Sequence, residues 1–104
     1  MTKLIQIDFD GVIHDTPKGY LNGELYGTLV KDAYFSIKNF LKEGYQVEIL
    51  TSRSPEEWPK VKEWLGKHGL DNLEVTNIKK SARFYIDDRA IRFTTWRDVS
   101  KYVI

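Results

Sequence analysis

Cysteine is absent from this chain of 104 residues, which excludes disulfides, thiolate metal ligands and a cysteine nucleophile. A chain of this length has room for one domain, which we place at residues 1–104. The first residues contain neither a signal-peptide core nor an apolar stretch long enough to cross a bilayer. We therefore expect a single cytoplasmic domain that does not contact a membrane.

A strong net charge is also missing. The chain has 16 Lys and Arg residues against 15 Asp and Glu residues, which argues against a protein that holds duplex nucleic acid by its phosphates. Hydrophobic residues make up 41% of the chain, so disorder is excluded as the main state. Residues 79–104 are basic and residues 1–78 are acidic on balance. A basic segment of this kind is usually solvated surface, and it is also suited to a small anionic ligand.

Short apolar runs alternate with segments of helical periodicity. Residues 4–9 are almost continuously apolar and stop at Asp10-Gly11, which is typical of a strand buried on both faces. The spacing predicts a helix over 29–43, a strand over 47–50 and a second helix that begins near Trp58 and ends near Lys67. Further short strands are expected at 73–75 and 84–86, and the segment from Thr95 forms a helix or a strand. This order predicts an α/β fold, a three-layer Rossmann-like domain with a mainly parallel sheet.

Two local signals refine this prediction. Asn22-Gly23 lies between Tyr20-Leu21 and Glu24-Leu25 and predicts a small hairpin, a flap after the first strand. The sequence Ser54-Pro55-Glu56-Glu57 has the spacing of a capping box and a proline suited to a first helical turn.

Polar side chains are expected where the predicted strands end. Because the carboxyl ends of parallel strands share one edge of a sheet, these side chains would lie close together. Clustered carboxylates repel one another unless a cation holds them, and oxygen ligands select a hard ion such as Mg²⁺. A metal ion with a lysine and a hydroxyl then forms a receptor for a phosphoryl group. The residues concerned are Asp8, Asp10, Thr51, Lys79, Lys80, Asp87 and Asp88.

These motifs resemble those of the haloacid dehalogenase superfamily. Asp8-Phe9-Asp10-Gly11-Val12 looks like its first motif, Ile49-Leu50-Thr51 like its second, and Lys79 ahead of Tyr85-Ile86-Asp87-Asp88 like its third and fourth. The resemblance extends over nearly the whole chain. The flap corresponds to residues 12–28, directly ahead of the first helix, so no cap domain is expected, and the chain is similar to the small capless phosphatases of that superfamily.

The resemblance implies an aspartyl-phosphate mechanism. Asp8 attacks phosphorus, and Asp10 protonates the leaving oxygen and later activates water. The phosphoryl oxygens are held by Thr51, Ser52, Lys79 and Gly11, and Mg²⁺ by Asp8, the Asp10 main-chain carbonyl and either Asp87 or Asp88. Between the adjacent lysines, Lys79 fits the family spacing better than Lys80, although a serine and a second lysine follow it where the family has a small residue or proline.

Other conspicuous residues have simpler interpretations. His14 is expected to be an exposed loop histidine near the site, and Arg53 and Arg89 are expected to form surface ion pairs rather than contact substrate. Trp58 shares a helical face with Val61 and Leu65, which favours a place in the core over a stacking platform for bases.

The function expected from these residues is a magnesium-dependent phosphohydrolase acting on a small phosphomonoester. Three alternatives stay open: a phosphatase of polynucleotide ends, a receiver-like phospho-acceptor, and a non-catalytic protein that binds phosphorylated ligands. A receiver is disfavoured because its phosphorylated aspartate follows a middle strand of the chain. The sequence leaves the substrate and the oligomeric state open.

Overall fold

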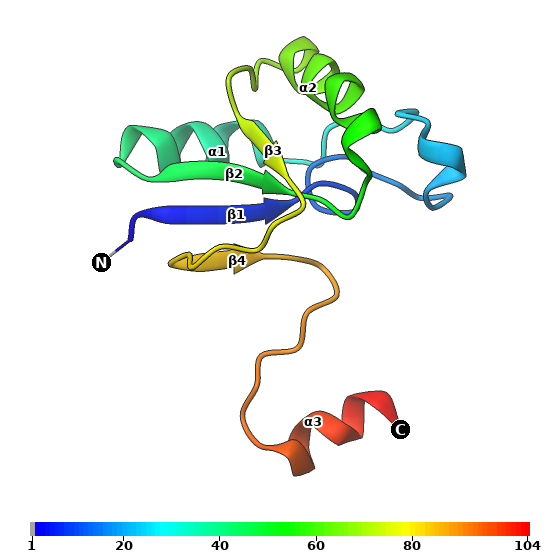
Figure 1. Cartoon of the computed structure of the whole chain (residues 1–104), viewed down its shortest axis with the longest axis vertical. Coiled ribbons are helices and arrows are strands. Elements are labelled where there is room, and N and C mark those ends of the chain that lie inside the picture. Colours follow the sequence, from blue (N-terminus) through cyan, green and yellow to red (C-terminus); the bar gives the residue numbers. More distant parts are fainter. Residues whose placement is uncertain (1) are drawn as a thin grey trace.

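The computed structural model describes residues 2–104 and has an α/β architecture (Figure 1). Four strands, β1 (Leu4–Asp8), β2 (Gln46–Leu50), β3 (Glu74–Thr76) and β4 (Phe84–Ile86), form the sheet. The α-helices are α1 (Ala33–Lys42), α2 (Trp58–Lys67) and α3 (Trp96–Val103), and two short 3-10 helices are η1 (Leu21–Gly23) and η2 (Pro55–Glu57).

The sheet is parallel, with the strand order β3-β2-β1-β4. In this register Ile7 of β1 lies between Ile49 of β2 and Ile86 of β4. The expected Rossmann-like α/β class is therefore confirmed. Because β1 is an inner strand, with β2 on one side and β4 on the other, its carboxyl end is flanked by the carboxyl ends of both neighbouring strands.

Both crossover helices contribute to one apolar core. The strands supply every second residue to this face, and α1 and α2 cover it, as right-handed crossovers that progress in one direction require. Trp58 packs partly buried against the same core, as the helical spacing predicts. Burial of each such side chain contributes about 1.5–3 kcal/mol. The buried residues at the centre of this core include Ile5, Ile7, Val47, Ile49, Ile37, Val61 and Leu65.

The other face of the sheet is covered by the extended connection 77–83 instead of a helix. Buried Gln6 donates from Nε2 to Glu48 Oε1 and to the carbonyl oxygen of Ile78, each at 3.1 Å. Lys80 completes the contact through a 2.8 Å ion pair from Nζ to Glu48 Oε2 and a backbone hydrogen bond to Gln6 Oε1. The third layer is thus thin and polar.

The helix boundaries differ in two places from those expected. The first helix begins at Ala33 and not at residue 29, because the backbone N–H of Val30 donates to the carbonyl of Ile13 and ties this stretch to the preceding loop. The second helix begins at Trp58 as expected, but the capping box does not form. Ser54 makes no side-chain cap bond, and the Glu57 carboxylate binds Arg53 and Tyr20 instead.

The hairpin expected at Asn22-Gly23 is wrong. These residues lie in the 3-10 turn η1, with φ of 55° for Asn22 and 81° for Gly23. The positive φ values agree with the turn propensity of Asn-Gly, but the flanking residues form no strand pair, because Tyr20 and Leu21 are exposed and have no apolar face to bury. We call residues 12–28 the flap segment. It closes at its base through a bridge between His14 and Leu29.

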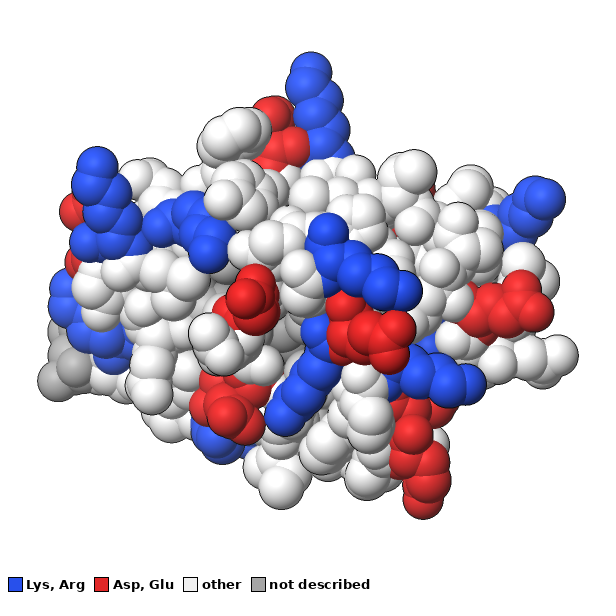
Figure 2. Space-filling model, turned by 90° about the horizontal axis from the view of Figure 1, so that it is seen from above, with Lys and Arg blue, Asp and Glu red and all other residues white. Residues whose placement is uncertain are grey.

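The C-terminal segment forms helix α3, capped by the Thr95 side chain, which accepts from the N–H of Asp98. In Figure 1 an extended stretch carries this helix away from the sheet, and Trp96 and Tyr102 are exposed. On the face shown in Figure 2, basic and acidic side chains are interspersed and form no broad patch of one sign. No helix among residues 2–104 is long and apolar enough to span a membrane.

Candidate active site

A cavity of about 430 Å³ lies at the carboxyl ends of the strands. The sequence placed most of its candidate residues here, and the fold brings them together from β1, from the segment after β2 and from the segments before and after β4. This is the edge at which open parallel sheets bind ligands. The lining residues are Asp8, Asp10, Leu50, Thr51, Ser52, Asn77, Lys79, Asp87 and Arg89.

Three aspartates form an acidic cluster at this edge. Asp8, Asp87 and Asp88 each place a carboxylate oxygen within 4.8 Å of the others. Burial, followed by the charge of Asp87, raises the pKa of Asp8 from 3.8 to about 6. This is the destabilisation that a bound cation removes, and three carboxylates are ligands suited to Mg²⁺. The donor set therefore fits the metal expected from the sequence, and both Asp87 and Asp88 are in position to serve as ligands.

Gly11 has a different role from the one expected. Its N–H donates to the carbonyl of His14 at 2.8 Å, so it is directed into the flap segment and not toward a phosphate. Gly11 has a φ of 86°, and a Cβ atom there would collide with the Asp88 carboxylate. Only glycine meets both demands without strain. Gly11 thus makes room for the acidic cluster, and its assignment as a phosphate ligand is wrong.

Thr51 and Ser52 follow β2 directly. The buried Thr51 hydroxyl oxygen accepts from the N–H of Arg53 at 3.1 Å, and its backbone N–H donates to Thr76. The hydroxyl proton of Thr51 can therefore be donated to an oxygen in the cavity. Ser52 is exposed and lines the same cavity.

The two adjacent lysines lie on opposite sides of the connection. Lys79 lines the cavity, and its ammonium lies 4.4 Å from the centre of the Tyr85 ring. Lys80 instead pairs with Glu48 on the polar face of the sheet. Of the two lysines, Lys79 is therefore the one that lines the cavity with Asp8 and Asp87.

Asp10 is surrounded by donors. Arg53 contacts both of its oxygens, from Nε to Oδ2 at 2.8 Å and from a terminal nitrogen to Oδ1 at 2.9 Å. His14 Nδ1 lies 2.9 Å from Oδ1. Burial alone would raise the pKa of Asp10, but the hydrogen bonds from Arg53 and His14 outweigh it and hold that pKa below its usual value. The protein keeps this carboxylate charged.

The expected exposure of His14 is wrong, and so is the expected surface location of Arg53, although the ion pairs expected for Arg53 are present. His14 is fully buried, stacked on Phe9 with ring centres 5.3 Å apart, and Arg53 is only 4% exposed. Gly27 N–H donates to His14 Nε2, so the ring proton resides on Nδ1 and is donated to Asp10. The sequence did not predict the contact between Arg53 and Asp10, because the two residues are 43 positions apart. The one local feature that indicated a place near the site was that Arg53 follows Thr51, the hydroxyl residue after β2, by two residues.

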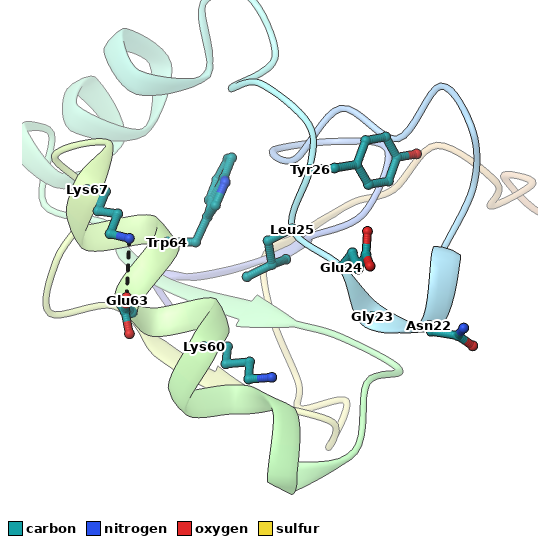
Figure 3. A pocket seen from close by; sticks show the side chains of 9 residues that line it. All are labelled: Asn22, Gly23, Glu24, Leu25, Tyr26, Lys60, Glu63, Trp64 and Lys67. Carbon is teal, nitrogen blue, oxygen red and sulfur yellow. Dashed lines mark ion pairs between the residues drawn. The ribbon is translucent and has the colours of Figure 1, made fainter.

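A second recess, of about 500 Å³, lies between the flap segment and α2 (Figure 3). Gly23, Leu25 and Tyr26 line one side, and Trp64 and Lys67 of α2 line the other. Lys67 is paired with Glu63 at 3.2 Å. None of the acidic-cluster residues lines this recess, so it is separate from the site described above.

Comparison with known proteins adds support for the fold alone. A solved structure described as that of a conserved protein from Bacteroides thetaiotaomicron matches with a TM-score of 0.66 and 21% sequence identity, and the match covers 96% of this chain and 88% of that chain. No family model and no curated protein matches this chain.

Proposed function

We propose that this protein is a magnesium-dependent phosphohydrolase of the haloacid dehalogenase type, which cleaves a phosphomonoester through an aspartyl-phosphate on Asp8. The observation that carries the proposal is the acidic cluster, because three carboxylates gather within 4.8 Å beside a cavity that Thr51 and Lys79 also line. An acidic cluster alone would suit any divalent cation. A hydroxyl and an ammonium across the same cavity favour a phosphoryl group as the second ligand.

Asp8 is the nucleophile in this proposal. One of its oxygens accepts from the N–H of Phe9 at 2.9 Å, which orients the carboxylate at the end of β1. Mg²⁺, held by Asp8, Asp87 and Asp88, supplies charge neutralisation for the approach of a carboxylate to a phosphate dianion. Attack by Asp8 forms a bond to phosphorus as the bond from phosphorus to the ester oxygen breaks, and Lys79 and Thr51 hold the phosphoryl oxygens.

Asp10 serves the second step in this scheme. Held as a carboxylate by Arg53 and His14, it is prepared to accept a proton from water. The water oxygen then bonds to phosphorus, the bond between Asp8 and phosphorus breaks, and inorganic phosphate leaves. Because Asp10 is held as a carboxylate, the arrangement favours Asp10 as base over Asp10 as acid. In the first step the departing oxygen takes its proton from water, unless the leaving group is a weak base that needs none, and the proton on Asp10 returns to water after phosphate leaves.

Burst kinetics on an aryl phosphate test the proposal. An aryl phosphate releases a phenolate that leaves without a proton, so Asp10→Asn should form the phosphoryl-enzyme and then stall. The expected result is a burst of phenolate with an amplitude near one per chain and no steady turnover. Mass spectrometry should locate the trapped phosphoryl group on Asp8.

The matched control is Asp8→Asn, which should show neither burst nor turnover. A burst from Asp8→Asn, or normal turnover by Asp10→Asn, would overturn the assignment of the two roles. A wild-type chain that accepts a phosphoryl group and never releases it would favour the receiver-like alternative.

The substrate is the open part of the proposal. No cap domain covers the cavity in the described chain, since η1 is the one regular element between β1 and α1. Selectivity therefore has to come from the flap segment, the neighbouring loops or a second subunit. Phosphate release from phosphorylated sugars, nucleotides, peptides and oligonucleotide ends, with and without Mg²⁺, would identify the substrate class.

A further inference from the structure

We propose that Arg53 is a positioning residue. It fixes the Asp10 carboxylate and couples the position of that carboxylate to the position of the flap segment. The catalytic consequence rests on the proposed function. The structural coupling does not, because it concerns contacts within the protein alone, and the two parts are therefore tested separately.

The hydrogen bonds of Arg53 converge from three segments of the chain. Its guanidinium contacts both oxygens of Asp10 at 2.8 and 2.9 Å. One terminal nitrogen donates to the Gly23 carbonyl at 2.9 Å and to Glu57 Oε1 at 3.1 Å. A single planar group thus joins the end of β1, the flap segment and the start of α2. A lysine could not do this, because its ammonium lacks the fixed fork of donors.

Packing holds the guanidinium in place. The Arg53 side chain is 2% exposed. Its guanidinium carbon lies 4.9 Å from the centre of the Tyr20 ring and 5.7 Å from that of Phe9. The Arg53 carbonyl accepts from Trp58 Nε1, and its N–H donates to Thr51. Both the backbone and the side chain are therefore fixed, so the position of Asp10 is defined by a rigid partner.

The flap segment meets this network at several points. Tyr20 donates to Glu57 at 2.6 Å, on the same oxygen that Arg53 contacts. The Gly27 N–H donates to His14 Nε2, and His14 Nδ1 bonds Asp10. Hydrogen bonds therefore run continuously from Arg53 through Asp10 and His14 to Gly27.

Close packing at the flap requires glycine at two of these points. A Cβ atom at Gly23 would collide with the Glu57 carboxylate, and one at Gly27 with the Asp15 carbonyl. A recess lies between this part of the flap segment and α2, and Lys60 and Trp64 line it on the α2 side (Figure 3). The contacts of Arg53 and Tyr20 bind the flap segment beside this recess.

Exchange of the Gly27 amide measures the coupling without reference to activity. In Arg53→Lys, Asp10 loses its bidentate partner and His14 its fixed acceptor, so the Gly27 N–H should exchange at least about tenfold faster, the loss of about one charged hydrogen bond. Amide exchange by NMR on the full chain gives the result. The matched control, Lys80→Gln, breaks an ion pair to Glu48 on the other face of the sheet and should leave Gly27 exchange unchanged.

Kinetics on an aryl phosphate measure the catalytic consequence. Arg53→Lys should lower kcat by about a hundredfold with little change in KM, because Asp10 is displaced while the phosphate ligands Lys79 and Thr51 remain. In Arg53→Ala, added guanidinium at concentrations far below those that unfold proteins should restore part of kcat, and methylammonium should not. A purely structural role would not give rescue by the planar cation alone.

Each outcome decides one part of the inference. Unchanged Gly27 exchange in a folded Arg53→Lys or Arg53→Gln chain overturns the coupling, whether or not the protein is a phosphatase. Faster exchange with unchanged kcat overturns the catalytic consequence and keeps the coupling. Failure of both variants to fold would show that Arg53 acts in folding and would overturn a positioning role. Wild-type protein that forms no phosphoryl-enzyme overturns the proposed function, and faster Gly27 exchange still supports the coupling.

Discussion

Asp8 and Asp10 stand two residues apart, yet their surroundings are opposite. Asp8 faces two further carboxylates, and burial and their charges raise its pKa to about 6. Asp10 faces a guanidinium and an imidazole, whose hydrogen bonds hold its pKa below the usual value. The fold pairs the Asp10 carboxylate with a buried arginine and gathers Asp8 with two like charges.

This difference shows how one strand end can serve two chemical purposes. Uncompensated charge at the acidic cluster favours binding of an external cation, whereas an internally paired carboxylate keeps its charge and orientation. The neighbouring residue Gly11 separates the two environments, because its missing side chain leaves the space that Asp88 occupies.

Removal of Mg²⁺ should have the largest effect. A chelator should abolish phosphate release, and saturating Mg²⁺ at about 100 times its Kd should stabilise the protein by about 2.7 kcal/mol, several degrees in Tm for a chain of this size. Differential scanning fluorimetry with and without Mg²⁺ measures the shift. Asp8→Asn should lose the shift and Asp10→Asn should keep it, because only the first carboxylate belongs to the acidic cluster. Equal shifts in both variants would remove the distinction between the two aspartates.

The two lysines should differ next most strongly. Lys79→Ala should lower kcat/KM by about a hundredfold, since it removes a cation from the cavity. Lys80→Ala should change it by less than about threefold and instead lower the free energy of unfolding by about 1–2 kcal/mol, because Glu48 loses its partner. Steady-state kinetics and urea titration measure the two quantities. If Lys80→Ala lowered kcat/KM more than Lys79→Ala did, Lys80 and not Lys79 would be the lysine of the third motif.

Gly11→Ala should have a smaller effect, which is a weaker affinity of the acidic cluster for Mg²⁺. Its positive φ imposes about 1–2 kcal/mol of strain, and its Cβ displaces Asp88, so Mg²⁺ affinity measured by calorimetry should fall about tenfold. Gly44→Ala is the control, since Gly44 has a φ of 92° and no atom within 4 Å of an added Cβ. It should show the strain with no change in Mg²⁺ affinity. Equal Mg²⁺ affinity in both variants would mean that Asp88 is not a ligand.

The smallest effect is the pH dependence of stability without Mg²⁺. The folded pKa of Asp8, about 6, lies above its ordinary value of 3.8, so the folded state binds the proton more tightly than the unfolded state does. The free energy of unfolding therefore falls as pH rises from about 4 to about 6, and the penalty is full above that window. Asp8→Asn should be more stable than wild type at pH 7, by less than about 1 kcal/mol because Asp8 is partly exposed to solvent, and the gain should be absent at pH 4. If Asp8→Asn were still more stable than wild type at pH 4, the added stability would have a cause other than the charge of Asp8.

Much of the fold follows from local patterns. The apolar runs place β1 and β4 within a residue of their observed limits, and the alternation with helices gives the parallel sheet. The sequence also brings Asp87 and Asp88 to the same edge as Asp8, because each acid directly follows or ends a strand. The sequence favoured Lys79 over Lys80 for the site, but it did not show what either side chain contacts. Their separation follows from the extended backbone at 77–83, which sends neighbouring side chains to opposite sides.

The rest depended on contacts between distant residues. Nothing local shows that Arg53 reaches Asp10, because a surface arginine and a buried one have the same sequence signature. His14 lies four residues after Asp10, but its burial results from the flap segment folding back so that Gly27 reaches the ring. The Asn-Gly turn was recognised, whereas the absence of paired strands around it follows from the exposure of Tyr20 and Leu21. Local sequence propensity therefore predicted the turn, whereas tertiary contacts determined that no strand pair forms around it.

The strand order has a consequence for protein synthesis. β4 pairs with β1, the first of the four described strands, yet it is the last of these four to be translated. A nascent chain that ends before Phe84 can already contain β1, β2 and β3 with both crossover helices, but it has neither Asp87 nor Asp88. Asp8 is therefore made before the other two aspartates, so a chain that ends before Phe84 cannot assemble the acidic cluster. In the proposed function, Asp8 would become reactive only after β4 has joined the sheet.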